Sequence, residues 1–375
     1  MSDLIVEATR VKDIQKHPNA DKLDVAIIKG WSVVVGKNQF KKGDSVIFVP
    51  PDALVPQALA QAWGVWKYLA TRKDTTIGRV KCVKLRQQTS YGFVVANTEN
   101  YPEGKDLKEL LGITKWEPPE PKIHVGDADK EHPLFGSYTS IQNIRNFPDI
   151  FIEGEIVKLS EKLHGCNAAV SLVFTPEEDS WYKKSLDLIK SFFGITNPLR
   201  TENGLYSFMI RSHNKRRKLG TKSLYETPLT EKMKQTLISL RDTFSPTQNV
   251  TSVVIFGEIF GGKIQDLKYG NLDKTDFRMF EIEINKKYID AEQVESISEK
   301  TEIPMVPVLY TGPYSDEIIQ KYTTGNTTLM KDNPHMREGV IIRPIKERFH
   351  PKIGRVILKS VSDVYLRRHD GTEYH

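Results

Sequence analysis

The sequence predicts an α+β protein with a small N-terminal β-barrel and a larger domain in which sheets are flanked by helices. The length of 375 residues exceeds one typical domain. Several short β-rich runs lie close together before residue 100, which is typical of a small barrel or sandwich. Strand-like and helix-like runs are mixed after residue 123, and the proline-rich segment WEPPEPK separates the two regions.

Five short strands are expected in the first hundred residues, because β-branched and aromatic residues gather there between turn-forming residues. These strands cover residues 24–29, 31–36, 45–49, 79–85 and 91–96, with a turn at 40–44. A short helix is expected at 107–111. The proline-rich run after it cannot continue a helix or a central strand. We therefore place the boundary there, which gives domains of residues 1–115 and 116–375.

The larger region mixes strands and helices in the manner of an α+β domain. Strands are expected at residues 155–161, 168–174, 206–211, 252–259, 277–284, 339–344 and 356–359. Helices are expected at residues 184–193, 230–244, 290–300 and 315–323. The sequence has no internal repeat and no low-complexity tract. We therefore expect one mixed domain rather than a repeat array.

The composition is that of an ordinary globular protein, with 39% hydrophobic and 27% charged residues. No run of about 18 apolar residues occurs, and the N-terminus lacks the apolar stretch of a signal peptide. Cys82 and Cys166 are far apart, which argues against a disulfide framework or a zinc cluster. The charge of +6 is compatible with a polyanionic partner. We therefore expect a cytoplasmic monomer with no membrane partner.

One lysine has informative surroundings. Lys162 follows a strand-like run in EGEIVKLSEKLHGCN, and Gly165 then permits a tight turn. The Lys-x-x-Gly tetrapeptide alone carries little information, since it is expected about once by chance in a chain of this length. It fits a solvated surface lysine equally well. The argument therefore depends on the longer string around Lys162.

That longer string resembles the nucleotidyl-attachment motif of the ATP-dependent RNA ligases. This family belongs with DNA ligases and mRNA-capping guanylyltransferases to one superfamily, and its motif often reads Glu-Lys-x-His-Gly-x-Asn. The matching residues are Glu161, Lys162, His164, Gly165 and Asn167. DNA ligases and capping enzymes usually carry Asp at the position of His164. The resemblance therefore implies that Lys162 is the catalytic residue that carries AMP, and that the matching residues belong to the ATP site.

Further motifs follow in the family's order, and the likeness spans roughly residues 134–362. It implies that Arg211, in FMIRSHNKRRK, contacts the AMP ribose and the nucleic-acid end. It also implies that Glu258, in VVIFGEIFGG, contacts a ribose hydroxyl and the metal environment. FRMFEI resembles the family's aromatic motif, which implies that Phe280, with Phe277 as second choice, stacks on adenine. Aromatic strand residues are often part of the core, so a core role for either ring stays open.

Two more motifs complete the series. Glu338, in REGVIIRP, resembles the family's Glu-Gly-Val-Ile strand, which implies a ligand of Mg²⁺ or Mn²⁺ that acts through water. Lys359, in VILKS, resembles the second lysine of a Lys-x-Lys motif, which implies contact with phosphate. Ile357 stands where the family often has the first lysine. Lys352 and Arg355 are the candidates to replace that missing lysine.

The N-terminal region has a likeness of its own. HPNADKLDVAIIKG and GDSVIFVPPDALVP resemble the tRNA-binding OB domains of some aminoacyl-tRNA synthetases. OB barrels bind strands through a charged groove and aromatic platforms, so Trp31, Phe48 and Tyr91 are candidate platforms, with core packing the main alternative for Phe48. An N-terminal OB domain is typical of one RNA-ligase subgroup. The expected fold class is α+β, with an OB-like β-barrel followed by a nucleotidyltransferase domain of antiparallel sheets and flanking helices.

The sequence therefore predicts an ATP-dependent RNA ligase. The expected partner is RNA with 3′-hydroxyl and 5′-phosphate ends, as a loose strand, a nicked duplex or an RNA/DNA hybrid. Two alternatives stay open: another covalent nucleotidyltransferase (DNA ligase or capping guanylyltransferase), and a nucleic-acid-binding protein with an inactive ligase core. His164 argues against the first, as does the short segment after Lys359, where those enzymes usually carry an OB domain. The retained lysines and glutamates of the motifs argue against the second.

Overall fold

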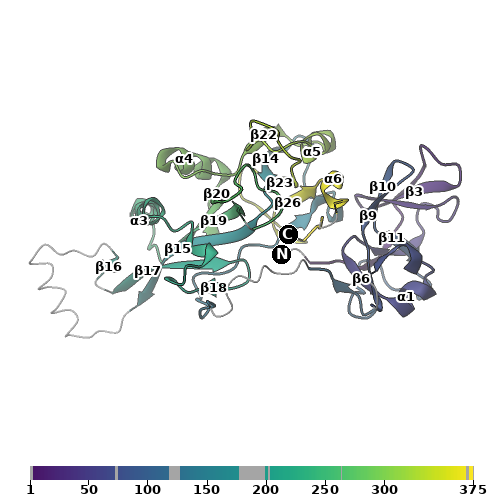
Figure 1. Cartoon of the computed structure of the whole chain (residues 1–375), viewed down its shortest axis with the longest axis horizontal. Coiled ribbons are helices and arrows are strands. Elements are labelled where there is room, and N and C mark those ends of the chain that lie inside the picture. The colour runs from purple at the N-terminus through teal and green to yellow at the C-terminus, as the bar shows by residue number, and fades with distance from the viewer. Residues whose placement is uncertain are drawn as a thin grey trace, which may run out of the picture.

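The computed structural model of the chain describes residues 3–71, 75–117, 127–176, 199–201, 203–262, 264–368 and 371–374. The chain forms a smaller β-rich part from its N-terminal third and a larger part from the remainder (Figure 1). Both chain ends lie near the place where the two parts meet (Figure 1). The helix expected at 184–193 and most of the proline-rich segment lie outside the described residues.

The N-terminal part consists of short strands in small sheets. One sheet has the order β1-β5-β11, a second is the meander β2-β3-β4, a third has the order β12-β6-β8-β7, and β9 pairs with β10. The strands are β1 Glu7–Arg10, β2 Asp13–Lys16, β3 Leu23–Ile28, β4 Trp31–Gly36, β5 Ser45–Val49, β6 Ala53–Pro56, β7 Ala70–Thr71, β8 Ile77–Arg79, β9 Cys82–Leu85, β10 Gln88–Tyr91, β11 Phe93–Ala96 and β12 Thr114–Lys115. Helix α1 (Gln57–Ala62) follows β6. Their pairs are antiparallel, which fits chain segments joined by short turns.

Local patterns predict some of these strands to the residue and fail for others. Residues 31–36 and 45–49 form β4 and β5 as expected. The single strand expected at 79–85 is instead two strands, β8 and β9, in different sheets. The helix expected at 107–111 is a series of turns that reaches Gly112, whose φ is +62°. One helical turn is costly to nucleate, so packing of the surrounding loop decides the conformation there.

The aromatic residues expected to act as base platforms are part of the core. Trp31, Phe48 and Tyr91 are only 2%, 2% and 7% exposed. The centroid of the Trp31 ring lies 6.0 Å from that of Phe48 and 5.5 Å from that of Tyr91. Arg145, from the larger part, covers the Tyr91 ring at 4.3 Å. The platform role is therefore wrong, because strand alternation turns these side chains inward, where they bury apolar surface.

The larger part is built on two sheets. The first has the order β13-β26-β23-β14-β22, and its β13–β26 pair is parallel. Its strands are β13 Gln142–Asn143, β14 Ile156–Lys162, β22 Val308–Pro313, β23 Gly339–Pro344 and β26 Leu358–Val361. The second has the order β16-β17-β15-β19-β20-β21, with β18 paired to β17. Its strands are β15 Cys166–Pro176, β16 Arg200–Thr201, β17 Gly204–Ser212, β18 Arg216–Arg217, β19 Ser252–Gly261, β20 Thr275–Ile284 and β21 Lys287–Tyr288.

In the larger part, the described α-helices are α3 Glu231–Phe244, α4 Ala291–Thr301, α5 Asp316–Thr323 and the short α6 Asp363–Leu366. The first three begin one residue after their predicted starts. The Thr230 side chain accepts a hydrogen bond from Met233 N, and the Ser315 side chain accepts one from Ile318 N. These caps satisfy main-chain donors that a helix start leaves free. None of the helices in the described ranges is long and apolar enough to span a membrane.

Helix α3 closes one face of the second sheet. Its residues Met233, Leu237 and Leu240 pack in one cluster with Val253 and Ile255 of β19. The alternation of strand side chains then turns the neighbouring residues of β19 toward the opposite face. On that opposite face, Val254 and Phe256 pack with Phe135 and Tyr138 in a second buried cluster.

A buried ion network joins the two sheets. Glu281 of β20 accepts hydrogen bonds from Arg343 of β23 at 2.9 Å and from Arg355 at 2.6 Å, and all three are at most 6% exposed. Burial alone would raise the pKa of Glu281, but the charges of Arg355 and Arg343 bring it below its ordinary value. Arg355 therefore has a structural partner and does not replace the missing motif lysine at Ile357. The other candidate, Lys352, is exposed next to the β24–β25 hairpin (Phe349–His350 and Gly354–Arg355).

The two parts of the molecule share an apolar cluster. Residues from the N-terminal strands, including Trp31 and Phe48, pack in the same buried cluster as Leu163, Phe260 and Tyr365 of the larger part. Buried apolar surface of this kind resists separation of the two parts. The N-terminal part is therefore fixed close to the segment that carries the Lys162 motif.

Candidate active site

Lys162 is the last residue of β14, and a buried carboxylate holds its amine. Its Nζ lies 2.5 Å from Glu338 Oε1, and the Glu338 side chain is 0% exposed. Lys162 pairs with Gly339, the residue after Glu338, in the antiparallel β14–β23 register. A buried carboxylate requires a charged or hydrogen-bonding partner. Strand pairing therefore places the two motif residues, 176 positions apart in sequence, in direct contact.

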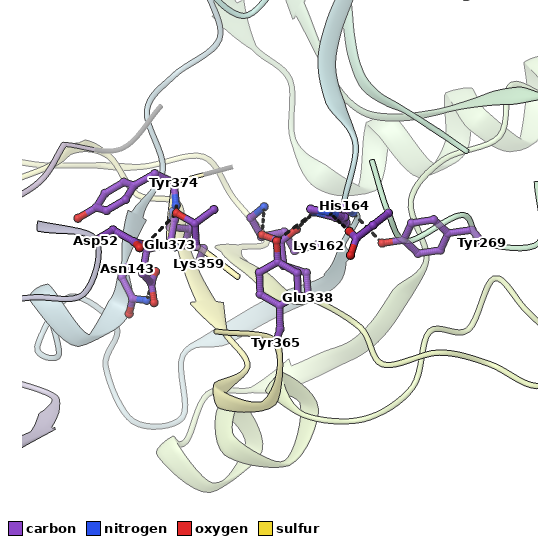
Figure 2. Close-up of polar contacts among 12 residues, drawn as sticks. Asp52, Asn143, Lys162, His164, Tyr269, Glu338, Lys359, Tyr365, Glu373 and Tyr374 are labelled. Carbon is purple, nitrogen blue, oxygen red and sulfur yellow. Dashed lines mark hydrogen bonds and ion pairs between the residues drawn. The ribbon is translucent and has the colours of Figure 1, made fainter. Parts of the chain in front are cut away.

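His164 lies next to this pair and joins it to three further side chains. Its Nε2 lies 2.8 Å from Asp266 Oδ1, and its Nδ1 lies 3.0 Å from the Tyr365 hydroxyl and 3.5 Å from Glu338 Oε2. The main-chain N–H of His164 donates to the Tyr269 hydroxyl at 2.7 Å. Figure 2 shows Lys162, His164 and Glu338 pointing toward one another. Contacts on both ring nitrogens and on the main chain fix the orientation of the ring.

Gly165 is required by a close approach between β15 and β19. A Cβ at this position would collide with the main-chain oxygen of Ile259 and would lie 3.0 Å from Glu258 Cγ. Only glycine fits against another backbone at this separation. The glycine of the motif therefore brings the Lys162 segment against the strand that carries Glu258.

Glu258 and Asn167 lie side by side on the face of the second sheet opposite α3. They are directly paired in the antiparallel β15–β19 register, and directly paired residues project from the same face. Burial raises the pKa of Glu258 to about 8, Lys162 lowers it, and Glu338 raises it. Glu258 is thus electrostatically coupled to the Lys162–Glu338 pair. A carboxyl with a strongly raised pKa in such a cluster is typical of a functional site.

Arg211 projects from the same face, one strand away. It pairs with Ala169, which lies two residues beyond Asn167 on β15. Its guanidinium donates to the Phe135 main-chain oxygen and lies 3.4 Å from Glu131. Burial lowers the pKa of Arg211, and the Glu131 charge opposes this. Arg211 therefore lies on the same face as Glu258 and Asn167 and is bonded to the 131–135 segment.

Phe280 and Phe277 lie in different environments. The β19–β20 register shifts so that Phe256 pairs with Glu281 and Gly257 pairs with Met279, which leaves Phe280 as a bulge residue. Phe280 is partly buried and its ring centroid lies 5.0 Å from that of Tyr138. Phe277 packs in the closed core with α3. Of the two rings, Phe280 is the one compatible with stacking on a ligand.

Lys359 lies on the same face of the first sheet as Lys162. The register pairs Lys162 with Gly339, and it pairs Gly339 with Val361 of β26. Lys359 lies two residues before Val361 on β26, so its side chain projects from the same face as that of Lys162. Lys359 is 3% exposed. Burial lowers its pKa to about 8, and the charges of Glu373, Glu338 and Asp52 oppose the decrease. The predicted phosphate-contacting lysine is therefore beside the Lys162–Glu338 pair but covered by other residues.

Glu161 is placed differently from the other motif residues. Strand alternation sends its side chain to the opposite face of β14 from Lys162. There Glu161 Oε2 accepts hydrogen bonds from the Thr328 main-chain N–H at 3.0 Å and hydroxyl at 3.1 Å. Its side chain therefore holds the loop that contains Thr328, and the expectation that it lines the ATP site is corrected to this structural contact.

Several residues of the site have no family motif in the sequence. Asp266 and Tyr269 lie in the loop between β19 and β20, Tyr365 lies on α6, and Glu373 lies near the end of the chain. Each reaches the site through tertiary contacts that local periodicity does not encode. A signal that could have found them is the density of tyrosine and acidic residues in short loops next to the motifs.

The carboxylates of the site fit a divalent metal. Glu338 pairs with Lys162 and directly precedes β23 of the first sheet, and Glu258 of β19 in the second sheet is electrostatically coupled to both. Among the described residues, no group of three or more His, Cys, Asp or Glu is arranged to hold a metal. Mg²⁺ commonly takes only one or two protein carboxylates and keeps several waters. The pair is therefore sufficient for a hydrated Mg²⁺ or Mn²⁺ ion.

Comparison with solved structures shows that the whole fold is shared with known proteins. A variant of Naegleria gruberi RNA ligase with ATP and Mn is 21% identical, with 99% of this chain and 100% of that chain covered and a TM-score of 0.73. Another variant with ATP and Mn is 21% identical, covers 98% of each chain and has a TM-score of 0.72. The same ligase with pyrophosphate is 20% identical, covers 98% of each chain and has a TM-score of 0.70. Among curated proteins, no sequence matches this chain significantly.

Family models cover both parts of the chain. An OB-fold domain model matches residues 5–97, which confirms the predicted N-terminal OB-like barrel. The RNA ligase model matches residues 155–361, from the strand that ends in Lys162 to the strand that contains Lys359. That match covers more than half of the 375 residues. The chain therefore belongs to the RNA ligase family.

Proposed function

We propose that this RNA ligase uses ATP to form a covalent AMP adduct on Lys162, transfers the AMP to an RNA 5′-phosphate, and seals that end to an RNA 3′-hydroxyl. The observation that carries the proposal is the position of Lys162. Its amine ends a strand, contacts the buried Glu338 at 2.5 Å and shares a sheet face with Lys359. The related N. gruberi ligase is described with ATP, AMP and Mn, which supports the same nucleotide chemistry here.

The first step would join the lysine amine to the α-phosphorus of ATP. A lone pair on Lys162 Nζ forms the new N–P bond, the bond between the α-phosphorus and the bridging oxygen breaks, and pyrophosphate leaves with that electron pair. The attacking nitrogen must lose a proton, and Glu338 Oε1, at 2.5 Å, is placed to accept it. Lys359, with its charge, would stabilise the phosphate oxygens during departure.

The two later steps use the same arrangement. A 5′-phosphate oxygen attacks the phosphorus of the lysyl-AMP, which breaks the N–P bond and returns the electron pair to the lysine nitrogen. The 3′-hydroxyl then attacks the 5′-phosphorus, its proton passes to a base or water, and AMP leaves with the bonding electrons. The protein's main contribution is to place these groups in line and to stabilise charge.

The remaining site residues have roles in holding the nucleotide. We assign Phe280 to the adenine face, and Glu258, Asn167 and Arg211 to the ribose side, because their sheet face is shared. His164 is assigned to the phosphate side, since Asp266 and Tyr365 fix its ring beside Glu338. Glu258 and Glu338 would hold Mg²⁺ or Mn²⁺, and phosphate charge would be neutralised by that ion when bound.

The decisive experiment uses α-labelled ATP with a divalent metal and a denaturing gel. We expect label to stay on the wild-type chain and to be absent from Lys162→Ala. The variant should still seal RNA that already carries a 5′-adenylate, because that step does not require the lysine adduct. No label on folded wild-type protein free of bound AMP, with ATP or GTP, would refute the proposal; label from GTP alone would favour a capping enzyme.

A second experiment addresses the polynucleotide. Nicked duplexes whose 3′-hydroxyl strand is RNA or DNA, and an unpaired RNA strand, would be offered with ATP. Sealing that requires an RNA 3′-hydroxyl supports the proposed substrate, whereas equal sealing of a DNA 3′-hydroxyl contradicts it.

We also propose that the domains divide near residue 115, where β12 still pairs with β6 of the barrel. We further propose that the enzyme acts in the cytoplasm as a monomer.

A further inference from the structure

The end of the chain is buried although it is polar. Residues Thr372, Glu373 and Tyr374 are 0%, 3% and 6% exposed. Burying a hydroxyl and a carboxylate is unfavourable unless each finds partners. Figure 2 shows this segment next to Lys359, on one side of the Lys162–His164–Glu338 cluster. The contacts of the segment therefore indicate what it does there.

One set of contacts ties the segment to the OB domain. Asp52 Oδ2 accepts hydrogen bonds from the Thr372 hydroxyl and from the Glu373 main-chain N–H, both at 2.8 Å. Arg79 donates to the Gly371 main-chain oxygen at 2.7 Å and pairs with Asp52 at 2.6 Å. The Tyr374 side chain packs in the apolar core of the OB domain. The last residues of the chain are thus bound by the first domain.

A second set of contacts reaches the ligase core. Lys359 Nζ donates a hydrogen bond to the Glu373 main-chain oxygen. Asn143 Nδ2 donates to Glu373 Oε2 at 2.8 Å, and Asn143 pairs with Lys359 across the parallel β13–β26 strands. Glu373 therefore touches Lys359 and the residue beside it. A lysine has a flexible four-carbon stem, so its ammonium needs such a partner to occupy one position.

We propose that the segment Gly371–Tyr374 is a positioning element that holds Lys359 for its phosphate contact only while the OB domain is docked. The inference rests on the proposed function, in which Lys359 contacts phosphate. Lys359 Nζ donates to a main-chain oxygen that carries no full charge, so this contact fixes the direction of the side chain and leaves its positive charge in place. The OB domain would then act on catalysis through Asp52, the tail and Lys359.

The first test compares full-length protein with a variant that lacks residues 371–375 and with Asp52→Asn. We expect both variants to lower the single-turnover rate of AMP transfer at saturating ATP by about 10- to 100-fold, with little change in the ATP concentration that gives half of the maximum rate. Glu103→Gln, on an exposed OB-domain pair with Arg10, is the matched control and should keep the wild-type rate. A faster truncated enzyme would overturn the inference, because the tail would then block the site.

The second test is a double-mutant cycle. If the tail acts through Lys359, removing the tail from Lys359→Ala should cause little further loss, whereas independent roles would multiply the two losses. Multiplying losses would overturn the inference. Wild-type protein that takes no label refutes the proposed function instead, so the two failures are distinguishable.

A third measurement does not depend on activity. Lysine acylation followed by mass spectrometry should modify Lys359 slowly in the wild type, because the amine is buried and hydrogen-bonded. The tail deletion and Asp52→Asn should increase the Lys359 modification rate at a temperature where circular dichroism shows that each variant is still folded. An unchanged modification rate at Lys359 in both variants would overturn the inference even if their catalytic rates were too low to compare.

Discussion

Replacing Lys359 by Met should make the protein more stable at neutral pH, and the gain should shrink as the pH rises. Burial lowers the pKa of Lys359 from its ordinary 10.5 to about 8. A shift of this size means that folding disfavours the charged form of Lys359, relative to the neutral form, by about 3 kcal/mol. The charged lysine therefore costs stability, and the phosphate contact proposed for Lys359 would explain why it is retained.

The sign of the pH dependence follows from proton binding. Below pH 8, both the folded and the unfolded chain hold the Lys359 proton, so the full penalty is present. Between pH 8 and 10.5 the folded chain has lost the proton while the unfolded chain keeps it, so folding becomes more favourable as the pH rises. At pH 9.5 the wild type should have recovered about 2 kcal/mol from this one group.

Urea unfolding at pH 7 and pH 9.5, followed by tryptophan fluorescence, measures the difference. The stability of Lys359→Met minus that of the wild type should fall by about 2 kcal/mol between the two pH values. Exposed Lys84→Met is the matched control and should show little difference from the wild type at either pH, because its side chain remains in water. A Lys359→Met difference that is equal at both pH values, or larger at pH 9.5, would refute the assigned burial of the ammonium.

Four other substitutions test the fold and the site. Glu281→Gln should cost about 3–5 kcal/mol in urea unfolding, because two buried guanidinium groups lose their shared anionic partner; a loss below about 1 kcal/mol would contradict the network. Phe280→Ala should raise the ATP concentration needed for half-maximal AMP transfer with modest loss of stability, whereas Phe277→Ala should cost about 3–5 kcal/mol and leave the nucleotide dependence unchanged if the protein folds. Gly165→Ala should abolish labelling by ATP, since a Cβ collides with the next strand; a labelled variant would show that the strands can separate.

Sequence patterns predict the regular elements wherever the pattern is local. Strands β4, β5 and β23 have the predicted bounds, because alternating β-branched residues end at turn-forming residues. Helix α3 begins at Glu231, one residue after the predicted start, and ends at Phe244 as predicted. Prediction fails where neighbours decide: residues 79–85 contain one apolar run, but the chain changes sheets within it. Such a change depends on which strands are adjacent in space.

In the candidate site, too, some features are predicted by the sequence and others depend on neighbours in space. Motif order predicts that Lys162, Glu338 and Lys359 belong to one site, and the β14–β23–β26 register brings them together. The sequence could not show that Glu161 faces the other side, since that depends on which face of β14 is covered. It also could not show that Asp266 and Glu373 belong to the site. Asp266 contacts His164 from about 100 residues away in the sequence, and Glu373 contacts Lys359 from 14 residues away.

The spacing of the Lys162 motif has a physical reason in this fold. Strand β14 belongs to the first sheet and ends at Lys162, while β15 belongs to the second sheet and begins at Cys166. Only three residues cross between the sheets, and they include His164 and Gly165. In the proposed function, Lys162 on one sheet and Asn167 on the other act on the same nucleotide, so they can lie close together only if this crossing is tight. The glycine permits that approach, and the histidine, held from both sides, fills the junction. The motif is therefore compact because it is the connection between two sheets, which is why its residues have to be tested together with Glu258 and Glu338 from the strands that flank it.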